Sequence, residues 1–553
     1  MTDNESDNDL FTDTDYSDEL SDDNEGRSSE ESESDTSNSD NDSDIDLPDA
    51  NPWFRIRGEE LDRDDPYDFL EHVGPQNIPD GTVKPIDYFL LFLSVDFLTK
   101  LVRYTNKCAA DFLRTAQLAP RSLARKWKET NIAEMKGFLA IILNMGLIRK
   151  PTIKQYWSTA PSQQTKWFHD VMVRDRFELL LKFFQMTDAA RLPRPGHPDY
   201  DPCARFQPIV DHANTISRHY YKPHREICID ESLIGTKNRT QLIQYLPNKH
   251  HHRWGIKLYM LCDSVSAYLL GFFVYKGRRD NIEAEAGDTD TGLAHKVVMR
   301  LLRLCSCLRR GYHVFIDNFF TSVPLVNELA TVNTHVTGTV RRNRKFLPRG
   351  LKQKLQVGEI INYRQGHILT TAYREKKTQK NAVLLLSTKN KAGTRDVPVR
   401  RRGQAAGDAP PMASKPLTVL DYNKYMGGVD QTDMMLYFYL DERRTVRYWK
   451  KVTFNILSRM LLNAYLLYKD HTTEKKKNRL QFQISTIEAL ISRNPQDEQP
   501  EAGTSGVCPI GTGEKDCCVC SNRKIPGGRK RSRTMCVKCK KGLHGPCFPK
   551  HKC

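Results

Sequence analysis

Two short apolar runs in the chain each end on a single carboxylate. Residues 312–322 read YHVFIDNFFTS and carry Asp317 after the run, and residues 226–235 read EICIDESLIG and carry Asp230 in the same way. A buried strand with this pattern places its acid at the rim of a sheet. Asp317 taken alone could instead cap a helix that begins near Ser322, because Asp is a good N-cap residue.

Two further acids, Asp430 and Asp433, stand three residues apart in the run YMGGVDQTDMM. They would share one face of a helix that begins after the two glycines. Carboxylates that converge repel one another unless a cation lies between them. Asp oxygens suit Mg²⁺, and two such ions about 3.5 to 4 Å apart can hold the attacking and leaving oxygens of a phosphodiester. We therefore expect two Mg²⁺ ions, held by Asp230, Asp317 and Asp430.

The elements between these acids predict an α/β fold with an RNase H-like sheet that mixes parallel and antiparallel pairing. The expected order is three strands, a helix, a strand, a helix and a strand, at residues 226–235, 255–262, 268–275, 293–308, 312–316, 324–330 and 336–340. In that architecture the first and fourth strands are neighbours, so Asp230 and Asp317 would lie side by side. The helix with Asp430 and Asp433 would then cross the sheet edge.

These motifs resemble the signatures of piggyBac-type transposases, and they stand in the family's order. The matching runs are ICIDES, LPNKHHHRWGIKLYMLCDS, FIDNFFTS, DYNKYMGGVDQTDMM and RRTVRYWKK, within about residues 87–470. The resemblance implies that Asp230, Asp317 and Asp430 match the three catalytic aspartates and Asp433 a fourth beside the third. It also implies cut-and-paste transposition of double-stranded DNA by a homodimer, with hairpin ends on the excised element and integration into TTAA targets.

The C-terminus has the spacing of a zinc module. Half of the 14 cysteines lie in its last stretch, where eight ligands form the pairs Cys517 and Cys520, Cys536 and Cys539, His544 and Cys547, and His551 and Cys553. Eight ligands suffice for two tetrahedral Zn²⁺ ions, and alternating pairs would give a cross-brace of RING or PHD type. A short Gly- and Lys-rich segment needs metal to fold. Cys518 is left over. In the family that the chain resembles, this domain recognises the terminal repeats.

Charge is divided unevenly along the chain. The net charge is +16, but residues 1–50 hold 20 acids and one arginine, which leaves an excess of +35 on the rest. This tail is too polar to fold, and we interpret it as a solubilising arm or as a competitor with DNA phosphates. The chain has no run of eighteen apolar residues and no signal segment, so we expect neither membrane insertion nor secretion. The basic run 529–533 suggests nuclear localisation, and double-stranded DNA rather than a small molecule is the expected partner.

The predicted organisation is an acidic tail (1–50), a helical dimerisation and DNA-binding region (80–224), an RNase H-like core (225–340), a β-rich insertion (341–416), the rest of the core (417–440), further DNA-binding helix (441–470), a linker (471–515) and the zinc module (516–553). Helical patterns occur at 87–100, 133–146, 173–186 and 446–468, the last of them amphipathic. Strand-like runs occur in the insertion at 359–363, 369–373 and 382–387.

Basic clusters supply candidate phosphate contacts, since such contacts need only charge and reach. They are Arg341, Arg342, Arg344, Lys345, Arg400, Arg401 and Arg402 in the insertion, and Arg443, Arg444, Arg447, Lys450 and Lys451 before and within the last helix. Each cluster could also be a solvated surface. His250, His251 and His252 are interpreted as basic groups near DNA, because consecutive side chains of an extended segment cannot all face one metal ion.

Two functions of different class remain open. One is an active DNA transposase, and the other is a domesticated relative that binds DNA or chromatin without cutting it. Retention of the four acids favours the first, because such acids repel one another without metal. A RING-type ubiquitin ligase would account for the zinc pattern but leave the large core unexplained.

Overall fold

The structure is a computed structural model that describes the chain from residue 52 onward. Residues 62–64, 247–252, 278–291, 399–411, 443–444, 446, 493–506, 510–512, 523, 526–527, 537–538, 545–546, 548–550 and 552–553 are outside the description. The predicted acidic tail, the three consecutive histidines, Arg400 to Arg402, Arg443, Arg444 and Cys553 therefore lie outside the described residues.

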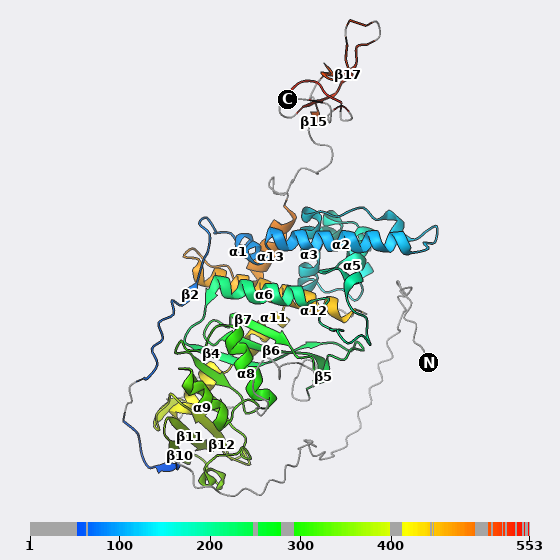
Figure 1. Cartoon of the computed structure of the whole chain (residues 1–553). Coiled ribbons are helices and arrows are strands. Elements are labelled where there is room, and N and C mark those ends of the chain that lie inside the picture. Colours follow the sequence, from blue (N-terminus) through cyan, green and yellow to red (C-terminus); the bar gives the residue numbers. More distant parts are fainter. Residues whose placement is uncertain are drawn as a thin grey trace, which may run out of the picture. The chain divides into compact units, whose positions relative to one another are not determined.

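A ten-stranded mixed sheet forms the centre of the described structure (Figure 1). Its middle strands are β4 (Glu226–Gly235), β6 (Trp254–Asp263), β7 (Leu269–Val274), β8 (His313–Ile316) and β9 (His335–Thr339). β4 pairs antiparallel with β6 and parallel with β8, and β8 pairs parallel with β9. The first and fourth strands of the predicted core are β4 and β8, and the prediction that they are neighbours is thus confirmed. A short strand that the sequence did not suggest, β5 (Ile243–Tyr245), pairs with the start of β6.

Helices connect and cover these strands. α8 (Leu293–Leu304) precedes β8, and α9 (Val323–Thr331) joins β8 to β9. β6 and β7 are buried along almost their whole length, as expected for strands that are covered on both faces. The Ser322 side chain accepts a hydrogen bond from the Leu325 amide and so caps α9. The alternative of Asp317 as the cap of that helix is therefore wrong.

The predicted insertion is part of the central sheet rather than a separate unit. Its strands are β10 (Ile360–Gln365), β11 (Ile368–Tyr373) and β12 (Val383–Ser387), and β12 pairs antiparallel with β9. A hairpin of β13 (Thr394–Pro398) and β14 (Met412–Pro416) follows. At the far edge, β1 (Phe54–Ile56) comes from the start of the described chain and pairs with β10. The three strand-like runs of the insertion were correctly located, but their fusion with the sheet was not foreseen.

Helices that precede the sheet in the sequence and helices that follow it pack together into one bundle (Figure 1). They are α1 (Pro85–Phe92), α2 (Val95–Thr115), α3 (Ile132–Leu147), α4 (Lys166–Val171), α5 (Arg174–Phe183) and α6 (Gln207–Tyr220), then α12 (Tyr448–His471) and α13 (Arg479–Ile491). The helix predicted at 87–100 is two helices, because the Ser94 side chain accepts from the Phe97 amide and starts a new one. The Asn131 side chain accepts a hydrogen bond from the Glu134 amide and caps α3.

Two predictions about residues 446–515 are wrong. The segment 471–515 is not a continuous linker, because α13 lies within it and buries Phe482, Ile487 and Leu490 in the core. The helix predicted at 446–468 is not amphipathic. It corresponds to α12, whose neighbours α1, α6, α11 (Gly428–Tyr437) and α13 surround it, so that even Lys450 and Arg459 are buried.

The C-terminal module contains two short, two-stranded antiparallel sheets. β15 (Val507–Pro509) pairs with β18 (Thr534–Cys536), and β16 (Lys515–Asp516) pairs with β17 (Arg531–Ser532). Its buried residues include two cysteines and Leu543. So small an apolar core fits a module that metal holds together.

Every helix in the described part of the chain is too short or too polar to cross a bilayer.

Candidate active site and Cys/His centres

Asp230 and Asp317 occupy equivalent places on adjacent parallel strands. The β4–β8 register ends with Ile229 opposite Ile316, and each acid is the next residue of its strand. β8 ends at Ile316, whereas β4 continues to Gly235. Asp317 therefore lies where the chain leaves the sheet beside β4. Strand pairing of residues more than eighty positions apart in the sequence thus brings the two carboxylates together.

The environment of Asp317 opposes its ionisation. Burial raises the pKa of this carboxyl, and the neighbouring Glu231 carboxylate raises it further, although amides that follow in the chain act against both. One of these amides, on Phe319, donates to Asp317 Oδ1 over 2.9 Å. A nearby cation would favour the charged form, so the donor set fits the divalent ions that the sequence predicts.

The third acid arrives on α11, which packs against β4 and β6. This approach is very close, since a Cβ on Gly428 would lie 2.6 Å from the Cys228 sulfur. Cys228, Asp230 and Ser232 alternate along β4 and therefore share the face that α11 covers. Asp430 lies in the first turn of the helix and is exposed. Gly428 is thus needed to seat this acid beside the sheet.

Asp433 has a different environment from the other three acids. Its Oδ1 accepts from the Ser232 hydroxyl over 2.9 Å and pairs with the Arg459 guanidinium over 3.0 Å. Arg459 comes from α12, is buried, and also donates to Ser232 and to Asn455. Asp433 therefore fixes α11 to β4 and α12 and neutralises a buried positive charge.

A tyrosine that the sequence reading passed over lies at the same place. Tyr422, on α10 (Leu417–Tyr425), has its pKa raised to about 12, first by burial and then by the negative charges of Asp317, Asp230 and Asp430. The phenol therefore lies within the field of all three acids and stays protonated at neutral pH. Its hydroxyl is 3.3 Å from the Thr339 hydroxyl, at the end of the strand next to β8. Its place in the run DYNKYMGGVD was the available signal.

Two of the predicted phosphate-binding arginines hold the segment that follows Asp317. Arg341 Nε donates to the Asn318 side chain over 3.3 Å, and Arg344 donates to the Asn318 and Phe319 carbonyl groups. Both guanidinium groups are thus close to the acids. Arg342 instead binds Asn381 and Lys352 within the insertion, and Lys345 is exposed.

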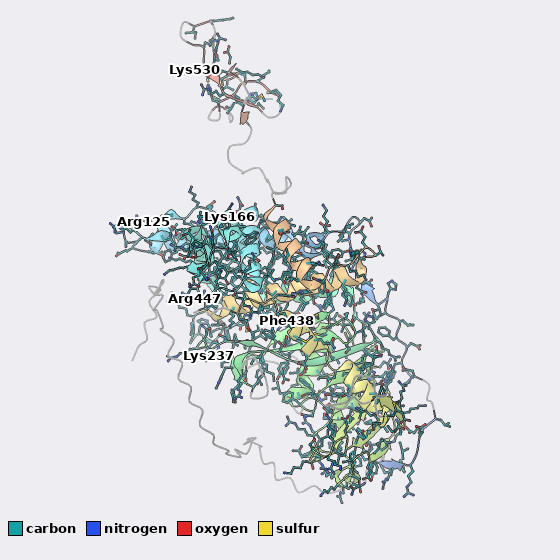
Figure 2. All side chains as sticks on the ribbon, turned by 180° about the vertical axis from the view of Figure 1, so that it is seen from behind. Arg125, Lys166, Lys237, Phe438, Arg447 and Lys530 are labelled. Carbon is teal, nitrogen blue, oxygen red and sulfur yellow. The ribbon has the colours of Figure 1, made fainter. Side chains whose placement is uncertain are left out.

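The basic start of α12 divides into exposed and buried members. Arg447 is exposed, and Figure 2 shows it on the same side of the main body as Lys237. Lys450 is buried and donates to the Leu181 and Lys182 carbonyl groups at the end of α5, and burial lowers its pKa to about 7. The expectation that Lys450 contacts phosphate is wrong, because its ammonium group is buried and donates to these carbonyl groups.

The C-terminal ligands form two groups in the alternating order. Cys517, Cys520, His544 and Cys547 have their ligand atoms within 4.8 Å of one another, and Cys536, Cys539 and His551 form the second group on the same criterion. The first and third pairs thus meet, and the second pair meets the fourth, as a cross-brace requires. Cys553, the predicted eighth ligand, is outside the described residues. Four thiolate or imidazole ligands at this separation fit tetrahedral Zn²⁺.

Hydrogen bonds orient both histidines. The Nε2 of His544 lies 2.8 Å from the Arg531 carbonyl oxygen, while its Nδ1 faces Cys520. His551 has Nε2 near the Cys539 sulfur and Nδ1 3.4 Å from the sulfur of Cys518, the leftover cysteine. Such outer contacts fix which ring nitrogen can bind a metal. Burial opposes ionisation of Cys517, but backbone amides of Cys520, His544 and Val519 lower its pKa to about 6.

The basic run at 529–533 is paired with acids of the same module. Arg529 lies 3.0 Å from Asp516, and Arg533 lies 3.0 Å from Glu514. These pairs are exposed and therefore weak. The arginines stay accessible to a receptor or to DNA.

Residues 84–465 match a family model described as Transposase IS4. The human PiggyBac transposable element-derived protein 3 is 23% identical over 430 residues, which cover 76% of this chain and 67% of that protein. The human PiggyBac transposable element-derived protein 2 is 23% identical over 414 residues, covering 71% of this chain and 63% of the relative. The chain thus spans about two thirds of the length of these curated relatives.

A solved structure shares the fold. It is described as the cryo-EM structure of a piggyBac transposase synaptic complex with hairpin DNA, and it matches with a TM-score of 0.64 and 23% identity. The match covers 86% of this chain and 97% of the other.

Proposed function

The chain belongs to the IS4-type transposase family, among the piggyBac transposable element-derived proteins, and from this premise we propose that it is a cut-and-paste DNA transposase. The observation that carries the proposal is the register of β4 and β8, which sets Asp230 beside Asp317 where the sheet opens. The fold is then an RNase H-like core, a nuclease scaffold whose acids lie at such an edge.

The residues present fit divalent metal. Asp230, Asp317 and Asp430 offer hard oxygen ligands from two strands and one helix, and all three act on the Tyr422 phenol. When bound, two Mg²⁺ ions would activate the attacking oxygen and stabilise the leaving one. Asp433 would hold α11 in place through Ser232 and Arg459 rather than bind metal.

Excision in the proposed reaction takes two phosphoryl transfers. Water first attacks a phosphodiester at the transposon end, and the 3′ oxygen of the element leaves as a hydroxyl group. That hydroxyl then attacks the opposite strand, which closes a hairpin on the element and releases the flank. Opening of the hairpin and attack on a TTAA target would complete the transfer. Asp230, Asp317 and Asp430 would hold the divalent ions to which the reacting phosphate binds, and Tyr422 would supply a neutral donor beside them.

The other parts of the chain would recognise and orient DNA. The cross-brace module would bind the terminal repeats with two structural Zn²⁺ ions, and the exposed cations, Arg447 among them, would contact phosphates. We further propose a homodimer that acts in the nucleus, consistent with accessible arginines in the run 529–533.

The deciding experiment is a cleavage assay. Purified full-length protein, Mg²⁺ and a duplex with a candidate transposon end should give hairpin products that run as a doubled strand on a denaturing gel. Blunt breaks without hairpins would refute this mechanism and leave a metal nuclease. Binding without any cleavage would support the alternative of a domesticated DNA-binding protein.

A further inference from the structure

One face of α11 carries exposed apolar side chains in line with an acid of the site. Asp430, Met434 and Phe438 are spaced four residues apart, and the backbone stays helical through Phe438. Positions four apart on a helix lie one above the other, at steps of about 6 Å along the axis. The row therefore starts at the acid and leads away from it.

Both apolar members of this row are strongly exposed. Met434 is 57% exposed and Phe438 is 68% exposed. Their helix neighbours Thr432 and Leu436 are buried against the sheet side, so the helix has a clear inner face. Two large apolar groups at this exposure beside a polar site indicate a binding surface rather than packing.

A cation lies at the far end of the row. The Arg149 guanidinium lies 3.2 Å from the Tyr437 carbonyl oxygen and 3.5 Å from that of Phe438, at the C-terminus of α11. A cation at this end of the row suits an anionic partner, and the apolar side chains suit a partner with flat, uncharged faces.

We propose that Met434 and Phe438 form a stacking surface for unpaired nucleobases of the DNA strand whose phosphodiester lies at Asp430. This inference rests on the proposed function. Paired DNA offers a helix only phosphates and groove edges, whereas strands that open for hairpin formation expose the faces of their bases. Apolar side chains stack on such faces without regard to sequence.

The test compares the full-length protein with two double variants. M434A/F438A removes the surface. F54A/M412A is the matched control, because Phe54 and Met412 are 64% and 61% exposed on strands outside α11. The probes are a fully paired duplex and the same duplex with a short central run of mismatches that contains 2-aminopurine. Binding is measured by fluorescence anisotropy at fixed salt without added Mg²⁺ or chelator, so cleavage does not interfere and the zinc module stays intact.

We expect the wild type to prefer the mismatched probe and to quench 2-aminopurine. M434A/F438A should lose about tenfold in affinity for that probe and most of the quenching, but keep its affinity for paired DNA within about twofold. F54A/M412A should match the wild type.

Four results would overturn the inference. Undiminished binding of the mismatched probe would show that the row does not hold bases. Equal losses on both probes would assign the row to paired DNA. A shift of the variant from dimer to monomer in sedimentation would assign it to a second copy of the chain. If the wild type bound neither probe, the proposed function itself would fail and the inference with it.

Discussion

Asp433 and Arg459 form an ion pair with 3.0 Å between the carboxylate and a guanidinium that is only 1% exposed. The pair joins the helix that carries Asp430 to the long buried helix α12, and Ser232 ties both residues to β4. A buried cation of this kind depends on its counter-ion, because losing one partner leaves an uncompensated charge. We therefore propose that the fourth acid of the motif acts on the scaffold of the site rather than in its chemistry.

Replacement of this acid should damage stability more than chemistry. Asp433→Asn is expected to lower the free energy of unfolding by about 3 kcal/mol, since Arg459 loses its counter-ion. Its cleavage rate below the melting range should fall less than that of Asp230→Asn, Asp317→Asn or Asp430→Asn. Urea unfolding and single-turnover cleavage measure the two effects. The control is Asp433→Asn combined with Arg459→Met, which should recover stability. A fully stable variant without cleavage would show that Asp433 is a metal ligand.

Asp317→Asn should abolish cleavage while leaving DNA binding intact. The amide keeps the shape of the side chain but not the charge that holds a divalent ion. Undiminished cleavage by the purified variant would remove Asp317 from the site.

The same variant has a defined pH signature without Mg²⁺. Burial and Glu231 raise the pKa of Asp317 in the folded state, so its ionised form destabilises the fold at pH values above the folded pKa. Asp317→Asn should therefore melt at a higher temperature than the wild type at neutral pH. This gain should shrink as pH falls toward the ordinary aspartate range, where both states are protonated. A constant difference across pH would contradict the assigned environment.

Tyr422→Phe tests the phenol among the acids. The change removes the hydroxyl that lies near Thr339 but keeps the ring. We expect the single-turnover cleavage rate to fall by about tenfold or more, in the range seen when one donor to a reacting group is lost. Because the pKa of Tyr422 is about 12, the wild-type rate should show no tyrosine titration below about pH 10. The matched control is Tyr425→Phe on the same helix, and an equal loss there would indicate a packing effect.

Substitutions of Arg447 and Lys450 should have separate effects, the first on DNA binding and the second on stability. Arg447→Gln removes an exposed cation and should reduce the slope of log affinity against log salt by about one, with little change in melting temperature. Lys450→Gln should lower the melting temperature and leave the salt slope unchanged, because its ammonium group binds carbonyl groups of α5. Salt titrations with the two purified variants provide the comparison. Similar slopes for both would argue against Arg447 as a phosphate contact.

The zinc module should contribute specificity rather than bulk affinity. Truncation before Cys517 is expected to weaken binding to transposon ends far more than binding to random DNA, since the remaining cations attract phosphates without reading sequence. Cys520→Ser should act in the same direction and lower the bound zinc measured by mass spectrometry. Equal losses on both DNAs at matched salt would count against a reading role.

Local sequence patterns predicted the parts of the site whose positions depend on local structure. Apolar runs before Asp230 and Asp317 marked two strands, and the expected strand order placed them side by side. Ligand pairs with two residues between their members predicted the grouping of Cys517 with Cys520, and the alternating order of the pairs predicted the cross-brace.

Contacts between residues far apart in the sequence have no local pattern that predicts them. Arg459 sits in an otherwise apolar helix, and only the fold reveals Asp433 as its partner. Tyr422 reads as one more aromatic residue until the acids gather around it. β1 is three residues long, and nothing in FRI specifies pairing with a strand that follows some three hundred positions later.

The pairing of β1 with β10 constrains the order in which the chain can fold during its synthesis. The Trp53 indole donates to the Phe346 carbonyl group across 293 positions, and β1 then joins β10. At the usual pace of translation a ribosome needs roughly 15 to 60 s to cover this interval. Until then the first strand has no partner, and the bundle still waits for α12 and α13. β1 can therefore join the sheet only after β10 has been synthesised, and until then its edge is open to chaperones.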